Sequence, residues 1–241
     1  MAAPTPTRAG ASLRRLDPRY AIALFPFVEG EAGEYGVYGG DDRQSIVEML
    51  AELHQATAAA GSAVRTTGLD LPGRHHLDAA LRELNEEWTG GPLSEPARAA
   101  IRDSASELAE LLTLAERLAA DAQARGGGWV VTHGEPHAAN VIRAGERRFL
   151  VDWDTVAIAP PERDLWMLVD DGADAADLYH RATGRPLDEA ALDCFRLTWD
   201  LKDLAEYLKA LRSPHQETDD TVRQYQALTR CAEIRRAWSH L

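Results

Sequence analysis

The chain has 241 residues, of which 45% are apolar, so it is long enough for one large domain or two small ones with a sizeable core. Its 39 acidic and 26 basic residues give a formal net charge of -13. This charge disfavours nucleic acid and anionic membranes as partners and favours a cationic ligand, although the charge by itself is better explained by an acidic solvated surface. Cys194 and Cys231 form no CxxC motif, and no apolar run approaches the ~18 residues of a membrane span, so we expect a cytoplasmic protein without a membrane segment.

The first 18 residues are rich in Ala, Pro, Thr and Arg and are expected to be disordered. The apolar segment 20–28 then predicts a strand, and its exposed edge would pair with another chain, so some self-association is expected. Gly30, Gly33 and Gly36 have the wrong spacing for a phosphate-binding loop and indicate turns.

Helices are expected where apolar residues recur with helical spacing and where capping residues or glycines mark the ends. On the apolar face of the first of them, His54 is better explained as a packed, hydrogen-bonded core histidine than as a ligand. The predicted helices cover residues 41–60, 75–88, 94–125, 161–169, 173–183, 188–210 and 217–240.

The chain is organised around residues 129–165, which predict a short strand, a polar loop and a β-hairpin with a turn at 144–146. Polar side chains follow the strand ends: Glu135 and Asn140 in the loop, and Asp152 and Asp154 at the end of the hairpin. Period-two spacing places both aspartates on one side of a strand, and the hairpin can bring them beside the loop. Three carboxylates and an amide around one point suit Mg²⁺ with phosphate oxygens, so the local chemistry indicates phosphoryl transfer.

These residues also resemble a known family. The run His133-Gly134-Glu135-Pro136-His137-Ala138-Ala139-Asn140 resembles the catalytic loop of the aminoglycoside phosphotransferases, distant relatives of protein kinases. Val151-Asp152-Trp153-Asp154 resembles their metal-binding segment, and Glu162-Arg163-Asp164-Leu165 is most similar to the spectinomycin phosphotransferase branch. The likeness runs from about Arg19 to the C-terminus.

The resemblance implies a role for each matching residue. Glu135 would be the base that accepts the proton of the substrate hydroxyl, and Asn140 and Asp152 would hold Mg²⁺ against the phosphates of ATP. Asp154 would be a supporting carboxylate near the metal, and Asp164 would anchor the loop. In the segment at 20–28, the backbone near Phe27 and Val28 would face the adenine, whereas the residues alone favour an ordinary buried strand.

The late helices supply the candidates for substrate binding. Asp200, Asp203 and Glu206 recur every three residues and share roughly one face of the helix predicted at 188–210. In the resembling family, acidic groups on late helices bind the amino groups of the antibiotic. A solvated charged face explains the same pattern.

Two departures from the family pattern bear on activity. Glu135 stands where the usual pattern has Asp, and a displacement of about 1 Å can cost on the order of 10²-fold in rate unless the loop compensates. The chain also has only two lysines, Lys202 and Lys209, both after the loop, and no G-x-G-x-x-G precedes them. The lysine and glycine-rich loop that grip nucleotide phosphates in kinases are therefore not in this sequence.

The resemblance therefore implies an α+β, protein-kinase-like fold with a mostly helical large lobe, a small central β-hairpin and a truncated small lobe. Residues 1–28 would be the disordered tail with the last small-lobe strand and hinge, and residues 29–241 the large lobe. The function would be ATP- and Mg²⁺-dependent transfer to a hydroxyl of a cationic, aminoglycoside- or aminocyclitol-like small molecule, as in antibiotic resistance.

Two alternatives stay open. The first is a catalytically impaired or non-catalytic relative, because the phosphate-gripping residues are missing. The second is a metal-dependent enzyme of another class, in which His133, Glu135 and His137 ligate Zn²⁺ or Fe²⁺ from an extended segment. Pro136 breaks a regular strand there, and this alternative leaves Asn140 and Asp152 without a role.

Overall fold

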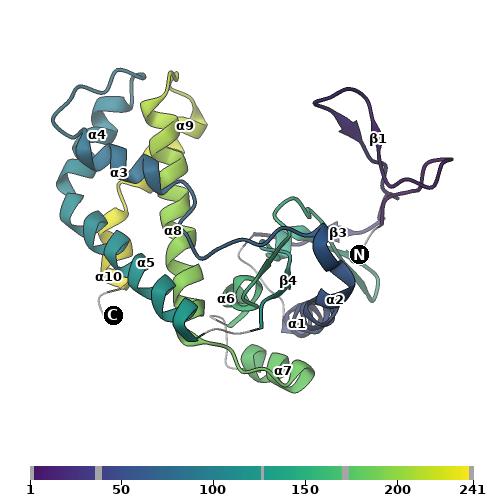
Figure 1. Ribbon diagram of the computed structural model, residues 1–241. Helices are drawn as coiled ribbons and strands as arrows, with labels where there is room; N and C mark the ends of the chain where they lie inside the picture. The colour runs from purple at the N-terminus through teal and green to yellow at the C-terminus, as the bar shows by residue number, and fades with distance from the viewer. Residues whose placement is uncertain (1–2, 36–39, 126–127, 170–173, 239–241) are drawn as a thin grey trace. The chain divides into compact units, whose positions relative to one another are not determined.

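The computed structural model describes residues 3–35, 40–125, 128–169 and 174–238. The chain divides into two compact units, one made of residues 1–67 and 128–187 and the other of residues 68–127 and 188–241. Each unit has its own cluster of buried apolar side chains. Helices dominate both units, and the strands are short and antiparallel (Figure 1), which confirms the predicted α+β, kinase-like class. Among the described residues, no helix is long and apolar enough to cross a membrane.

The first unit contains every strand that the structure describes. They form three small sheets, with the orders β1-β2, β3-β5-β6 and β4-β7. Their bounds are β1 Arg14–Arg15, β2 Ala21–Ile22, β3 Glu31–Ala32, β4 Val130–Thr132, β5 Val141–Ala144, β6 Arg147–Leu150 and β7 Ala157–Ala159. The predicted central strand and hairpin are thus confirmed as β4 and β5–β6, whereas β3 and β7 were not predicted.

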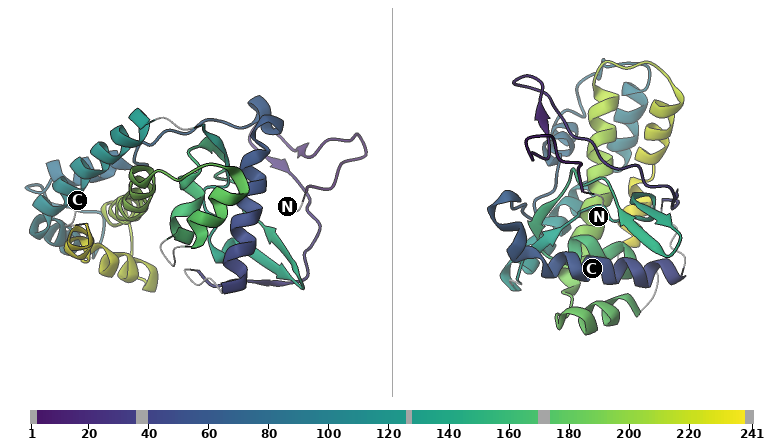
Figure 2. Two further views of the ribbon diagram at one scale, coloured as in Figure 1. Left: turned by 90° about the horizontal axis from the view of Figure 1, so that it is seen from below. Right: turned by 90° about the vertical axis from the view of Figure 1, so that its right-hand side faces the viewer.

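The helices of this unit pack beside the sheets. α1 (Gly40–Gln55) contacts α6 (Glu162–Val169) and α7 (Asp174–Thr183), as Figures 1 and 2 show. The single helix predicted over 41–60 is wrong, because the chain breaks at Ala56 before α2 (Thr57–Ala60) and the 3₁₀ turn η1 (Gly61–Ala63).

From the sequence, Asp41 or Asp42 is expected to cap this helix, but Asp42 lies inside α1. The helix begins at Gly40, and the carboxylate of Asp42 pairs instead with two arginines of the hairpin, at 3.2 Å from Arg143 and 2.8 Å from Arg148. Asp42 therefore joins α1 to the hairpin rather than capping the helix.

The N-terminal segment differs from its prediction. Instead of a strand over 20–28, only β2 forms, and it pairs with β1, which lies in the stretch expected to be disordered. The apolar side chains around it are exposed, and Phe27 is 89% exposed, so the expectation of a buried strand is wrong. Gly30 lies at a bend before β3, in keeping with the expected turn, whereas Gly33 follows β3 outside any turn. A Cβ would collide with the hairpin backbone at Gly30 and with the Ala138 backbone at Gly33. Gly36 lies outside the described residues.

The second unit is a bundle in which the long helices α5 and α8 lie side by side (Figure 1). The helix predicted over 94–125 is interrupted at Ser104, the one over 75–88 ends at Arg82, and the one over 217–240 is two helices. α8 begins where expected, because Asp188 caps it by accepting from the Ala191 N–H. The helices are α3 Arg74–Arg82, α4 Ser94–Asp103, α5 Ala105–Arg125, α8 Glu189–Arg212, α9 Asp219–Leu228 and α10 Cys231–Ala237.

Candidate active site

The loop that follows β4 carries the site, and its backbone has a conformation that requires glycine. Gly134 has φ +100°, and a Cβ there would lie 2.5 Å from Nη1 of Arg163 and closer to the other guanidinium atoms. Glycine is the residue that adopts such a φ without strain. Gly134 thereby turns the chain out of β4, so that Glu135 stands at the head of the loop.

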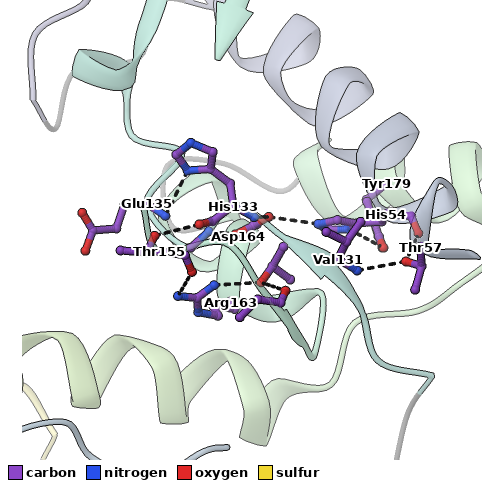
Figure 3. A network of polar contacts seen from close by, with 12 residues as sticks. His54, Thr57, Val131, His133, Glu135, Thr155, Arg163, Asp164 and Tyr179 are labelled. Atoms are coloured by element: carbon purple, nitrogen blue, oxygen red, sulfur yellow. Dashed lines mark hydrogen bonds and ion pairs between the residues drawn. The ribbon is translucent and has the colours of Figure 1, made fainter. Parts of the chain in front are cut away.

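Asp164 of α6 holds this turn from behind. Its Oδ2 accepts from the His133 N–H at 2.8 Å, and its Oδ1 accepts from the Gly134 N–H at 2.6 Å (Figure 3). Burial raises the pKa of Asp164, but hydrogen bonds from His54 and from these two amides outweigh burial and hold the pKa below its usual value. The side chain is therefore an ionised, buried anchor, which confirms the role predicted for Asp164.

Arg163 and Thr155 hold the loop from the other side (Figure 3). The Arg163 guanidinium donates to Thr132 Oγ1 at 2.8 Å and to the Thr155 carbonyl at 2.9 Å, and Thr155 Oγ1 donates to the His133 carbonyl at 2.7 Å. Burial lowers the pKa of Arg163, opposed by the nearby carboxylates of Asp164 and Glu135. Neither Arg163 nor Thr155 had a predicted role, because their contacts join residues that are 8 to 31 positions apart in the sequence.

His133 is fully engaged inside the loop. Its Nδ1 accepts from the Glu135 N–H at 3.3 Å, its Nε2 donates to the Val151 carbonyl at 2.8 Å, and its ring meets Trp153 edge-on at 4.7 Å. Burial lowers the pKa of His133, in keeping with this neutral form. Because both nitrogens are used, His133 does not fit the Zn²⁺ or Fe²⁺ alternative. Across the described ranges, no three His, Cys, Asp or Glu side chains are placed to share an ion, so the three carboxylates do not meet at one point either.

Two of the residues expected to hold the metal, Asn140 and Asp152, lie near His137. Asn140, in the 3₁₀ turn η2 (Ala138–Asn140), donates from Nδ2 to the Glu135 carbonyl at 2.9 Å, which fixes the orientation of its amide. Burial lowers the pKa of His137, while the carboxylates of Glu135 and Asp152 oppose this shift. Glu135 and Asn140 are thus joined through the loop backbone, and the carboxylates of Glu135 and Asp152 both lie near enough to His137 to affect its pKa.

Asp152 and Asp154 do not leave a strand as predicted, since β6 ends at Leu150 and both lie in the following loop with exposed side chains. Within the part of the chain that the structure describes, Asp152 is the one non-glycine residue with positive φ, at +64°. Such a conformation costs free energy and is concentrated at functional sites, although Asp tolerates it better than most residues. An exposed carboxylate at Asp152 and an amide oxygen at Asn140 are hard oxygen ligands, so the donor chemistry fits Mg²⁺, which needs only one or two protein ligands beside phosphate.

The three acidic residues predicted to bind substrate lie on α8, in the second unit. Asp200 and Asp203 line a cavity of about 260 Å³ together with Tyr207 and Arg230. Burial raises the pKa of Asp200 to about 6, opposed by a hydrogen bond with Trp238.

Glu206 differs from the other two acids. It pairs with Lys209 at 3.0 Å and does not line that cavity. Of the three acidic residues that the helical spacing groups, Asp200 and Asp203 therefore share a cavity, and Glu206 lies apart from it.

Comparison with known proteins agrees with this geometry in fold. The structure is similar to the spectinomycin phosphotransferase APH(9)-Ia, solved with ADP and spectinomycin, with a TM-score of 0.77 and 18% identity over 100% of this chain and 78% of that one. It is also similar to a choline/ethanolamine kinase family protein from Mesorhizobium loti, with a TM-score of 0.57 and 17% identity over 97% and 74% of the two chains. The fold is therefore that of the kinase-like phosphotransferases.

Sequence comparison assigns the family. Residues 3–193 match the phosphotransferase enzyme family APH, and the chain belongs to it. Protein StrN from Streptomyces griseus is 29% identical over 234 residues, which are 95% of this chain and 70% of that protein. The resemblance drawn from the loop motif is thus confirmed at the level of the family.

Proposed function

We propose that this protein transfers the γ-phosphate of ATP, with Mg²⁺, to a hydroxyl group of a cationic small molecule of the aminocyclitol or aminoglycoside type. The observation that carries the proposal is the loop itself: Glu135 stands on a turn held by Asp164, and the amide of Asn140 is tied to the Glu135 backbone at 2.9 Å. Preorganised groups of this kind are what phosphoryl transfer requires, because its catalysis rests on positioning and electrostatics.

Each residue of the loop has a defined part in this proposal. Glu135 accepts the proton of the acceptor hydroxyl as that oxygen attacks the phosphorus. Asn140 and Asp152 hold the metal, which supplies neutralisation of phosphate charge, and Asp154 supports it. The backbone at Phe27 and Val28 faces the adenine.

The acceptor side of the proposal rests on α8. Two half-buried carboxylates in one cavity attract a cation, and the chain as a whole carries a net charge of -13. We assign Asp200 and Asp203 to the amino groups of the substrate, with Glu206 as a weaker candidate because Lys209 already neutralises it. The spectinomycin phosphotransferase was solved with spectinomycin, an aminocyclitol, which supports this substrate class.

A second candidate is a relative that binds these ligands without efficient transfer. Its support is that both lysines, Lys202 and Lys209, lie on α8, where Lys202 stands over the ring of Trp199 and Lys209 pairs with Glu206. The phosphate-gripping lysine of kinases thus has no counterpart in this sequence. We therefore expect turnover below the usual kinase range of about 1–100 s⁻¹.

The test is to incubate the protein with γ-labelled ATP, Mg²⁺ and a panel of aminocyclitols and aminoglycosides, and to follow label transfer. Glu135→Gln keeps the size of the side chain but removes the proton acceptor, so transfer should fall strongly while ATP affinity stays near that of the wild type. Glu146→Gln, an exposed residue in the hairpin turn, is the matched control. Label transfer that is equal in both variants would remove Glu135 from the mechanism, and ATP binding without any transfer would favour the second candidate.

The metal assignment has its own test. Asp152→Ala should abolish Mg²⁺-dependent ATP binding in calorimetry while the far-UV circular dichroism stays near normal, and Asp154→Ala should weaken binding less. Equal nucleotide binding by Asp152→Ala and the wild type would contradict the assignment.

A further inference from the structure

A chain of buried polar side chains continues behind the Asp164 anchor. His54 of α1 places Nε2 3.1 Å from Asp164 Oδ2 and Nδ1 2.9 Å from the hydroxyl of Tyr179 on α7 (Figure 3). His54 is 3% exposed, Tyr179 0% and Asp164 1%. Side chains from α7, α1 and α6 therefore form one series of contacts that ends at the Asp164 carboxylate, and that carboxylate holds the loop.

The direction of the hydrogen bonds follows from the chemistry of Tyr179. Burial raises the pKa of its hydroxyl to about 12, so the hydroxyl keeps its proton at neutral pH and can donate to Nδ1 of His54. A neutral imidazole that accepts at Nδ1 carries its proton at Nε2 and donates it to Asp164. Tyr179 thus selects the tautomer of His54 that binds the anchor.

The anchor depends on this support because of how its oxygens are shared. Oδ1 accepts from Gly134, while Oδ2 accepts from both His133 and His54. Without the imidazole, Oδ2 keeps one donor, and a buried carboxylate with too few partners rotates or recruits a proton to lower its free energy. Either change loosens the two amides next to Glu135.

We propose that His54 and Tyr179 are positioning residues for the loop that carries Glu135: they fix the carboxylate of Asp164, and through it the amides of His133 and Gly134. The proposal rests on the proposed function for its effect on turnover, but its effect on the loop is independent of any reaction. Since a displacement of about 1 Å at a catalytic group can cost on the order of 10²-fold in rate, loosening this anchor should reduce kcat far more than nucleotide binding.

The experiment compares four variants of the full chain. His54→Leu removes both hydrogen bonds, His54→Gln offers an amide donor to Asp164, and Tyr179→Phe removes only the hydroxyl. Val47→Ala is the matched control. Val47 lies on α1 as His54 does, is 0% exposed and belongs to the same apolar cluster as Tyr179. The substitution therefore lowers the stability of this unit without removing a hydrogen bond to Asp164. The readouts are amide hydrogen exchange at His133 and Gly134, and kcat and KM for ATP.

His54→Leu should speed exchange at the two amides by about tenfold or more relative to Val47→Ala, as expected for one lost hydrogen bond to a charged group. It should lower kcat by about 10²-fold with KM for ATP within about threefold, and His54→Gln should recover most of the loss. The exchange rates and the kcat of Tyr179→Phe should lie between those of His54→Leu and of the Val47→Ala control. If His54→Leu does not fold, Tyr179→Phe serves as the test variant instead.

Two outcomes overturn the proposal. The first is that the amides of His133 and Gly134 exchange as slowly in His54→Leu as in Val47→Ala. The second is that Val47→Ala loses as much kcat as His54→Leu; if His54→Leu does not fold, Tyr179→Phe takes its place in both comparisons. A wild-type protein that transfers no phosphate defeats the proposed function instead, and the exchange rates then decide the positioning role by themselves.

Discussion

Replacing Gly134 by alanine tests how tightly the loop is built. The substitution adds one methyl group at φ +100°, where it would lie 2.5 Å from Nη1 of Arg163 and closer to Cζ and Nη2. The guanidinium cannot simply swing away, because it donates to Thr132 Oγ1 at 2.8 Å and to the Thr155 carbonyl at 2.9 Å. The backbone must relax, or Arg163 must leave its hydrogen bonds.

The magnitude follows from these two costs. A side chain at such a φ costs about 1–2 kcal/mol. Breaking the hydrogen bonds of a largely buried guanidinium costs about 1.5–3 kcal/mol. Gly134→Ala should therefore lower the free energy of unfolding by about 2.5–5 kcal/mol, which is a large part of the roughly 5–15 kcal/mol that holds a domain folded.

The assay is urea denaturation followed by far-UV circular dichroism, with Gly145→Ala as the control. Gly145 in the hairpin turn has φ +63° but no atom within 4 Å of an added Cβ, so it reports the backbone cost alone, about 1–2 kcal/mol. Introducing Arg163→Ala into the wild type and into Gly134→Ala completes a double-mutant cycle. Without Arg163, most of the free-energy cost of Gly134→Ala beyond that of Gly145→Ala should disappear. Equal losses for Gly134→Ala and Gly145→Ala would refute the reasoning, as would additivity with Arg163→Ala.

Three further predictions concern the rest of the chain. A hydrogen bond from Arg98, one turn away, lowers the pKa of Glu95 to about 2. The ionised carboxylate therefore stabilises the fold above pH 4.5, the pKa of the unfolded chain, and this stabilisation is lost as the pH falls towards 2. The urea midpoints of wild type and Glu95→Gln should accordingly converge between pH 4.5 and 2. Burial raises the pKa of Cys194 to about 12, so in a Cys231→Ser background the thiol should react with maleimide only after unfolding, and fast labelling of the native protein would contradict its burial. Phe25 and Phe27 are 58% and 89% exposed in an N-terminal segment that also carries Arg8, Arg14, Arg15 and Arg19, on a chain of net charge -13. Replacing both phenylalanines by serine should therefore reduce self-association in sedimentation velocity, and an unchanged profile would exclude this segment as the contact.

Elements with strong local signals could be predicted from the sequence. The hairpin β5–β6 combines two apolar runs with a glycine at the turn, and Asp188 caps α8 by the contact expected of an N-cap aspartate. Strands β3 and β7 could not be predicted, because each has only two or three residues and exists through pairing with a distant strand. Their sequences carry no alternating pattern that would reveal that partner.

Helix breaks escaped prediction for a related reason. The apolar spacing of residues 41–60 is continuous, yet the chain breaks at Ala56, and Thr57 places its Oγ1 where the Val131 N–H donates to it at 2.9 Å. This contact joins residues 74 positions apart and satisfies an amide of β4. Local propensity favours one long helix over residues 41–60. The structure instead has two shorter helices, and the hydrogen bond between Thr57 and Val131 forms next to the break between them.

The site divides along the same line. The roles proposed for Glu135, Asn140 and Asp152 come from a motif whose members are near one another in sequence. The contacts that hold the loop cannot be found in this way, because His54 binds Asp164 across 110 positions of the sequence and Tyr179 across 125. A pattern that reads His54 as a core residue is correct about its burial and silent about the carboxylate it binds, because periodicity reports which face of a helix is buried but not which polar group lies opposite. The support of an active-site loop is therefore a property of the packed helices, and it becomes visible only where their side chains meet.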